Sequence, residues 1–153
     1  MKNSILWETI TESVSIKNTV ESVFSAFANL PRWKDILPDV LDVKVLYDDG
    51  YNQEFTMTVE RPTGEETVRG IRYCVPNVSL ELFQPEPPPG FQYMIGQWKF
   101  FPDLEGTLVV GTRRFVLTPE EQNNSSNINE LAGKKLRGYL KHNLSIFKTA
   151  LEQ

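Results

Sequence analysis

The sequence predicts an α+β fold in which a curved antiparallel sheet wraps around one long C-terminal helix. The first observation behind this prediction is the strictly alternating segment 51–60, whose even positions are all polar. The second is a series of strand-like segments separated by turns of hairpin length. The third is a long amphipathic segment from about Ile128 to Leu151, the one element with enough apolar surface to cover the sheet. A bent sheet is not filled by one helix alone, so we also expect an internal cavity.

The length and charge of the chain limit the classes of function. With 153 residues the chain is long enough for one core and short for two, which predicts a single domain over residues 1–153. A net charge of -4 without a long Lys/Arg cluster argues against nucleic acid as a partner. No apolar run is long enough to span a membrane. The lone cysteine, Cys74, cannot form an internal disulfide, which favours a cytoplasmic location.

The N-terminal part of the chain predicts one strand followed by two short helices. Residues 5–16 are rich in β-branched side chains and are interpreted as a strand. Asn18 is the predicted cap of the first helix, with Glu21 at its third position. The second helix, over 30–38, has a proline suited to its first turn and ends at another proline. The first helix has an apolar face made of Val20, Val23, Phe24 and Phe27.

The middle of the chain predicts six more strands, which makes seven in total. The segment 84–90 contains four prolines and is predicted to be a stiff loop at the rim of the sheet. The buried face of the clearest strand is predicted to carry Tyr51, Gln53, Phe55, Met57 and Val59. The six strands are predicted over residues 43–47, 51–60, 65–75, 79–83, 92–101 and 106–117.

The end of the chain predicts a polar linker and then the long helix. Residues 118–127 have the composition of a flexible linker, and Asn127 is the predicted cap of the helix, with Glu130 three residues later. The apolar stripe of the helix is interrupted by one polar residue, Asn143. The stripe consists of Ala132, Leu136, Tyr139, Leu140, Asn143, Leu144, Phe147 and Leu151.

Several short motifs resemble those of one known family. They are Ala28 to Trp33, Cys74 to Asn77, Gly90 to Met94, Gln97-Trp98, Gly106-Thr107, Arg114-Phe115 and Thr118-Pro119. On these motifs, nearly the whole chain resembles the START and birch-pollen-allergen-like (SRPBCC) superfamily. Within it, the chain is most similar to the polyketide cyclase/dehydrase group, especially the tetracenomycin-type aromatase/cyclases. The resemblance implies a helix-grip fold with a ligand cavity.

The resemblance also implies an activity. Members of that group bind a poly-β-ketone chain presented by an acyl carrier protein and promote aldol ring closure followed by dehydration. In those relatives an arginine lines the pocket at the position that Cys74 occupies here, and two tryptophans stand where this chain has Val68 and Gly70. Arg72 lies two residues before Cys74, on the same face of the predicted strand. These departures imply a cavity of different shape and therefore a different substrate.

Two arginines are the candidate catalytic residues. Ring closure forms an enolate, and a fixed guanidinium donates hydrogen bonds where this negative charge develops. Arg72 and Arg113 suit this role. Arg72 would alternatively be a solvent-facing residue at a sheet edge. Arg113 shares its face with apolar neighbours, and Glu12 is its predicted partner, in a site or in a structural ion pair.

Aromatic and sulfur-containing side chains form the predicted substrate-binding set. As a group they suit an adaptable pocket, although plain core packing would explain any one of them. Tyr93 projects to the other side of its strand and is interpreted as structural. The set consists of Trp33, Leu37, Phe55, Met57, Cys74, Phe91, Met94, Trp98 and Phe100.

Two functions from different classes remain open. One is a cofactor-independent polyketide cyclase or aromatase/cyclase, favoured by the similarity from Gly90 to Trp98. The other is a non-catalytic carrier or sensor of a lipid, quinone or other hydrophobic ligand, favoured by the absence of the family arginine. Neither reading involves a metal or nucleotide cofactor, because the chain has a single histidine, His142, predicted to be on the surface, and no phosphate-binding loop. The sequence is compatible with a monomer or a homodimer.

Overall fold

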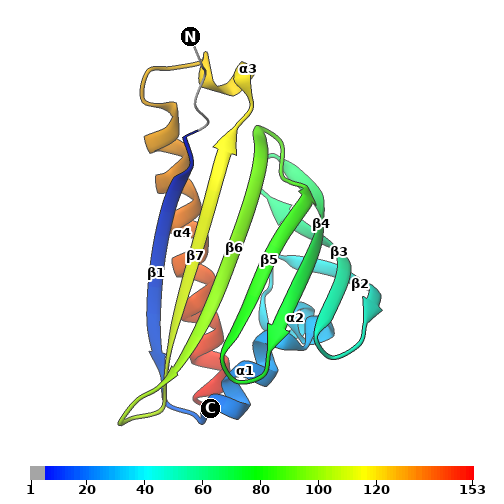
Figure 1. The fold of residues 1–153 in the computed structure, drawn as a ribbon, viewed down its shortest axis with the longest axis vertical. Helices are drawn as coiled ribbons and strands as arrows, with labels where there is room; N and C mark the ends of the chain where they lie inside the picture. The colour runs from blue at the N-terminus through cyan, green and yellow to red at the C-terminus, as the bar shows by residue number, and fades with distance from the viewer. Residues whose placement is uncertain (1–5) are drawn as a thin grey trace.

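A computed structural model describes residues 6–153 and contains the predicted helix-grip architecture (Figure 1). Seven antiparallel strands form one sheet in the order β1-β7-β6-β5-β4-β3-β2. The long helix α4 lies behind β1 and β7 in Figure 1, and α1 and α2 lie together near one end of the sheet. The elements are β1 (Glu8–Ile16), α1 (Val20–Ala28), α2 (Leu30–Ile36), β2 (Val40–Asp48), β3 (Asn52–Arg61), β4 (Gly64–Val75), β5 (Ser79–Glu86), β6 (Phe91–Pro102), β7 (Thr107–Leu117), α3 (Pro119–Gln122) and α4 (Ile128–Leu151).

The alternating pattern of β3 decides which face of the sheet is inside. Gln53, Phe55, Met57 and Val59 are buried, and the intervening polar residues point to the outer face. Tyr51 was predicted to share the buried face, but its side chain is 54% exposed because it precedes β3 in the turn. The inner face of the sheet is therefore set by the period of two, from Gln53 onward.

The core lies where α1, α4 and the inner face of the sheet meet. The ring of Phe27 stacks on Phe147 of α4 with a centroid distance of 4.0 Å and meets Trp98 of β6 edge to face at 5.0 Å. Phe100 packs against Phe24 and Phe27 at 5.2 and 5.4 Å. These aromatic contacts fix the short helix α1 against both the sheet and α4.

The helix ends differ from the predictions in two places. Thr19, not Asn18, caps α1, since its hydroxyl accepts a hydrogen bond from the Ser22 amide at 3.2 Å. Asn18 is used elsewhere, because its side-chain amide donates to the Leu151 carbonyl at the end of α4, at 2.8 Å. The helix α4 has the predicted bounds, but Asn127 makes no side-chain cap and instead accepts a hydrogen bond from the Ser125 hydroxyl.

Other predicted segments also differ from the structure. The strand β1 begins at Glu8, and Ile5 lies outside the described residues. The polar segment 118–127 contains the short helix α3, because the Thr118 hydroxyl accepts a hydrogen bond from the amide of Glu121. The loop predicted over 84–90 begins later, since β5 continues to Glu86.

The proline in β5 explains how a strand continues through a segment predicted to be a loop. The ladder between β5 and β6 ends at the pair Phe83 and Ile95, and only Glu86 pairs onward with Arg69 of β4. Pro85 therefore has no paired residue on a neighbouring strand, so the amide hydrogen that proline lacks is not needed for a ladder hydrogen bond.

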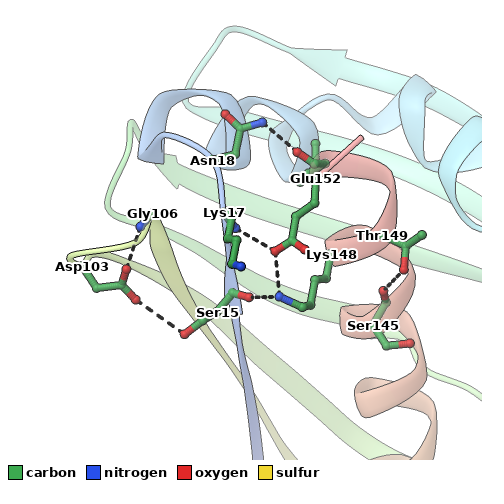
Figure 2. Close-up of polar contacts among 10 residues, drawn as sticks. Ser15, Lys17, Asn18, Asp103, Gly106, Ser145, Lys148, Thr149 and Glu152 are labelled. Atoms are coloured by element: carbon green, nitrogen blue, oxygen red, sulfur yellow. Dashed lines mark hydrogen bonds and ion pairs between the residues drawn. The ribbon is translucent and has the colours of Figure 1, made fainter.

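Polar contacts hold the C-terminal end of α4 against β1 (Figure 2). The Lys148 ammonium donates to the Ser15 carbonyl at 2.6 Å and lies 2.7 Å from the Glu152 carboxylate. The same carboxylate accepts a hydrogen bond from the Lys17 amide at 2.8 Å. The hydrogen bond from Lys148 lowers the pKa of Glu152. This end of α4 is thus fixed to the sheet.

Among residues 6–153, no helix has the length and apolar character needed to cross a membrane.

Candidate functional site

A cavity of about 150 Å³, here called the inner chamber, lies between the inner face of the sheet, α2 and α4. Six residues of the predicted binding set line it, namely Trp33, Leu37, Phe55, Met57, Met94 and Trp98. They come from α2 and its C-terminal end, β3 and β6, which the fold brings together although they are far apart in the sequence. The alternation of β3 and β6 directs these side chains inward.

Three residues of the predicted binding set lie outside the inner chamber. Phe100 is part of the aromatic core beside Phe24 and Phe27, so core packing is its role. Cys74 is buried beside a separate groove at the end of α1, and its thiol donates to Gln53. Phe91 lines a separate, more exposed groove near the N-terminal half of α4.

Arg72 faces the inner side of the sheet and is almost completely buried, with 2% of its surface exposed. This position contradicts the alternative of a solvent-facing edge residue. Its Nη1 and Nη2 atoms donate to the carbonyls of Phe27 and Ala28, both at 2.9 Å, and its Nε donates to Gln53 Oε1 at 2.9 Å. The two carbonyls belong to the last turn of α1, whose final carbonyls lack helical partners. Burial lowers the pKa of Arg72 to about 10, so the guanidinium is charged at neutral pH.

Gln53 connects Arg72 to the residues behind it. Its amide nitrogen donates to the Ala28 carbonyl at 2.9 Å and to the Asp48 carboxylate at 3.2 Å. Its carbonyl oxygen accepts from Arg72 and, at 3.4 Å, from the thiol of Cys74. Burial raises the pKa of the Cys74 thiol, while the nearby charge of Arg72 opposes that rise. The thiol is therefore a protonated hydrogen-bond donor at neutral pH, in a network that links β3, β4 and α1.

Arg113 has far fewer partners. Its Nη1 donates to the Thr112 carbonyl at 3.0 Å, and its guanidinium carbon lies 4.8 Å from the centroid of the Trp98 ring. Glu12, its predicted partner, lies 3.6 Å from Arg137 instead, so that prediction was wrong. Glu12 points toward α4, where Arg137 is the nearer cation. Within the described part of the chain, no carboxylate forms an ion pair with Arg113.

The free side of the Arg113 guanidinium faces the inner chamber. Among residues 6–153, every fully enclosed side-chain nitrogen or oxygen has a hydrogen-bond partner. The nitrogens of Arg113 that bond to no protein group therefore border accessible space, and Arg113 lines the chamber. Burial alone lowers its pKa to about 10, which still leaves it charged at neutral pH. Gly96 gives the guanidinium its room, because a Cβ at that position would lie 2.6 Å from Nη1.

Sequence reasoning missed a group of polar residues in the lining. Arg61, Glu66, Tyr139 and Asn143 all border the inner chamber. Tyr139 and Asn143 lie on the predicted apolar stripe of α4, and a polar group on such a stripe was a signal for a cavity. Arg61 and Glu66 gave no comparable signal, because charged residues near a strand end are usually solvated.

The exposed part of α4 carries the single histidine. His142 lies 3.9 Å from Asp39 through Nε2, and its side chain is 56% exposed, so it is on the surface as predicted. Among the described residues, no group of three or more His, Cys, Asp or Glu side chains is placed to hold a metal ion.

The comparisons with known proteins identify the family. The family described as polyketide cyclase / dehydrase and lipid transport matches residues 8–152. The chain belongs to this family. No curated protein matches the sequence.

Solved structures share the fold of this family member at low sequence identity. StfQ, a di-domain ARO/CYC from the steffimycin pathway, has a TM-score of 0.83 at 22% identity, covering 96% of this chain and 51% of StfQ. Zhui, an aromatase/cyclase from a Streptomyces species, has a TM-score of 0.80 at 20% identity over 96% of this chain and 94% of Zhui. A START superfamily protein from Mycobacterium smegmatis has a TM-score of 0.74 at 16% identity, covering 95% and 97%. The chain spans about half the length of StfQ and of the di-domain BexL.

One departure from the family pattern has a visible structural effect. Gly70 pairs with Phe55 across β3 and β4, and a Cβ at Gly70 would lie 2.5 Å from the Phe55 ring. Phe55 thus occupies space that a large side chain at position 70 would otherwise fill. Val68 borders the same chamber from β4. Phe55 and Val68 line the chamber on this side, and Gly70 leaves room for the Phe55 ring.

Proposed function

We propose that the chain is a polyketide cyclase or aromatase/cyclase that folds a poly-β-ketone intermediate and promotes its aldol cyclisation and dehydration. The observation that carries this proposal is Arg113, a charged guanidinium that borders an aromatic and methionine-lined chamber and has no carboxylate partner among residues 6–153. Membership of the polyketide cyclase family supports the class of reaction. An acyl carrier protein that presents the chain is the proposed partner, and no cofactor is required.

The proposed chemistry uses Arg113 to stabilise negative charge on oxygen. A methylene group between two ketones loses a proton, and the resulting charge resides mainly on a ketone oxygen. Hydrogen bonds from a fixed guanidinium in a partly enclosed site stabilise this oxygen more strongly than water does. The enolate carbon then forms a bond to a second carbonyl carbon, which closes the ring, and the oxygen of that carbonyl takes up a proton. Loss of this hydroxyl together with an α-hydrogen as water then leaves a carbon–carbon double bond in the ring. Asp39 and Glu66, at the border of the chamber, are the candidate proton acceptors.

Arg72 has a different proposed role in the same site. Three of its five N–H groups bond to Phe27, Ala28 and Gln53, which leaves two for a substrate oxygen. We assign it mainly to the positioning of α1 and secondarily to the positive potential of the chamber. Trp33, Phe55, Met57, Met94 and Trp98 are the proposed apolar wall that bends the substrate.

The test is a product analysis with a poly-β-ketone-loaded acyl carrier protein. The reaction is run with the protein, without it, with Arg113→Ala, and with Arg114→Ala as the matched control. Arg114 is the next residue of β7, points to the outer face and lies over Trp7. We expect one cyclised, dehydrated product from the wild type and from Arg114→Ala. Arg113→Ala should lower its rate of formation by about 10²–10³-fold, as for loss of an oxyanion donor.

The opposite result would favour the carrier function. The inner chamber has a volume of about 150 Å³, which is smaller than the roughly 300–1,000 Å³ typical of small-molecule sites. This volume favours a ligand smaller than a poly-β-ketone chain, one that the protein carries without reaction. If the protein leaves the spontaneous product mixture unchanged, the cyclase proposal is wrong. Native mass spectrometry of the purified protein then identifies a retained hydrophobic ligand.

A further inference from the structure

The groove that contains Phe91 borders the inner chamber directly. This outer groove, of about 320 Å³, lies between the turn after β3, the segment from Pro88 to Phe91, and the N-terminal half of α4. Five residues line both spaces, namely Arg61, Glu66, Pro88, Leu136 and Tyr139. The two spaces together fall within the usual range for a small-molecule site, while the inner chamber alone does not.

Three of the shared residues stand between the two spaces, and we call them the partition. Arg61 from the end of β3 places its guanidinium carbon 4.4 Å from the ring centroid of Tyr139 on α4. The Nε atom of Arg61 lies 3.7 Å from the Glu66 carboxylate of β4. The side chains of Arg61 and Glu66 are 25% and 24% exposed, so this contact is weak enough to open.

The two ends of α4 make different contacts with the sheet. The C-terminal end of α4 is bound to β1 through Lys148 and Glu152. Tyr139 lies more than two turns before that end, and it meets β3 through the contact with Arg61. Because Arg61 and Tyr139 line both spaces, we expect displacement of their side chains to join them.

We infer that the outer groove and the inner chamber are two compartments of one binding site, joined when the partition opens. The ligand class is an elongated chain with an oxygen acceptor near one end; that this chain is a poly-β-ketone rests on the proposed function. The oxygen acceptor lies in the inner chamber near Arg113, and the remainder of the chain lies in the groove against Phe91, Ile128 and Leu131.

The test uses cis-parinaric acid, a long fluorescent carboxylic acid, and two matched pairs of variants. Leu131→Glu places a charge in the groove, where Leu131 is 49% exposed, and Leu104→Glu places one on the fully exposed turn between β6 and β7. Arg61→Ala removes the partition contact. Arg69→Ala removes the equivalent cross-strand contact with Glu54 on the outer face of the same two strands.

Each pair has an expected result and an opposite one. We expect Leu131→Glu to weaken equilibrium binding about tenfold or more, with Leu104→Glu equal to the wild type. In stopped-flow measurements, Arg61→Ala should raise the association and dissociation rate constants about tenfold together, with Arg69→Ala unchanged. Any one of three results would overturn the two-compartment site. The first is equal binding by Leu131→Glu and Leu104→Glu, and the second is equal rate constants for Arg61→Ala and Arg69→Ala. The third is the absence of saturable binding by the wild type. These readouts do not depend on cyclisation, so a failure of the proposed reaction remains distinguishable.

Discussion

The two arginines on the inner face of the sheet are bonded in different ways, Arg72 being buried and Arg113 partly exposed. Arg72 donates to Phe27, Ala28 and Gln53, and Gln53 connects it to the carboxylate of Asp48. Arg113 donates to one carbonyl, that of its neighbour Thr112, and otherwise rests on an aromatic ring. Burial lowers the pKa of both arginines to about 10, so each remains charged at neutral pH.

The difference indicates a mainly structural role for Arg72 and a mainly chemical role for Arg113. A buried cation whose three nitrogens all donate to the protein stabilises the fold around it. A cation at a cavity wall with most of its donors free leaves hydrogen bonds for a ligand. Arg72 and Arg113 therefore should respond oppositely in measurements of stability and of activity.

The largest effect expected on stability is that of Arg72→Ala. This change removes three buried hydrogen bonds, to Phe27, Ala28 and Gln53, while Trp33 and Gln53 still donate to the two carbonyls; we expect a cost of about 3 kcal/mol. For a chain of 153 residues the melting temperature should fall by about 10 °C. Calorimetry checks this value, with Arg113→Ala expected to stay within about 2 °C of the wild type. A stable Arg72→Ala protein without activity would place Arg72 among the residues that act on the substrate.

A smaller effect is expected from Gly96→Ala, which leaves both arginines in the sequence. The new methyl group would lie within 2.6 Å of Arg113 Nη1, so the guanidinium must move. Misplacement of a catalytic donor lowers rate without unfolding the protein, and we expect about a tenfold loss in kcat. The product assay measures it, with Gly138→Ala as the control, because a Cβ at Gly138 meets nothing within 4 Å. Full activity in Gly96→Ala would show that the observed position of Arg113 is not required.

The smallest effect is expected from Cys74→Ser, a change within the hydrogen-bond network of Arg72 and Gln53. Because burial raises the thiol pKa, Cys74 is a donor to Gln53 that a serine hydroxyl can replace. We expect a loss of about 0.5 to 1 kcal/mol in the free energy of unfolding and unchanged product formation. Urea denaturation and the product assay check both values. Loss of activity at unchanged stability would mean that Cys74 takes part in the reaction.

The fold was predictable because its main signals are local. The alternation over 51–60 and the stripe over 128–151 each fix one element and its buried face. The wrong details involve partners distant in the sequence. Asn18 is not the cap of α1 because its side chain bonds to Leu151, and β5 continues through Pro85 because β6 has already separated there.

The candidate site was predictable only in part, for the same reason. Strand periodicity correctly directs Arg72 and Arg113 inward, and both border the chamber. It does not show which of them is already bonded, because that depends on the end of α1 reaching Arg72 from 45 residues away. Strand periodicity also placed Phe100 in the pocket. In the structure, Phe100 packs against Phe24 and Phe27 of α1 instead.

The close approach of Phe55 and Gly70 has an evolutionary consequence. The two positions face each other on neighbouring strands, and the ring of Phe55 occupies the space where a side chain at Gly70 would begin. A larger residue at position 70 therefore requires a smaller one at position 55. Among relatives, the sizes of these two residues should vary inversely. Such paired exchanges would reshape the chamber for a new substrate without any change in the backbone.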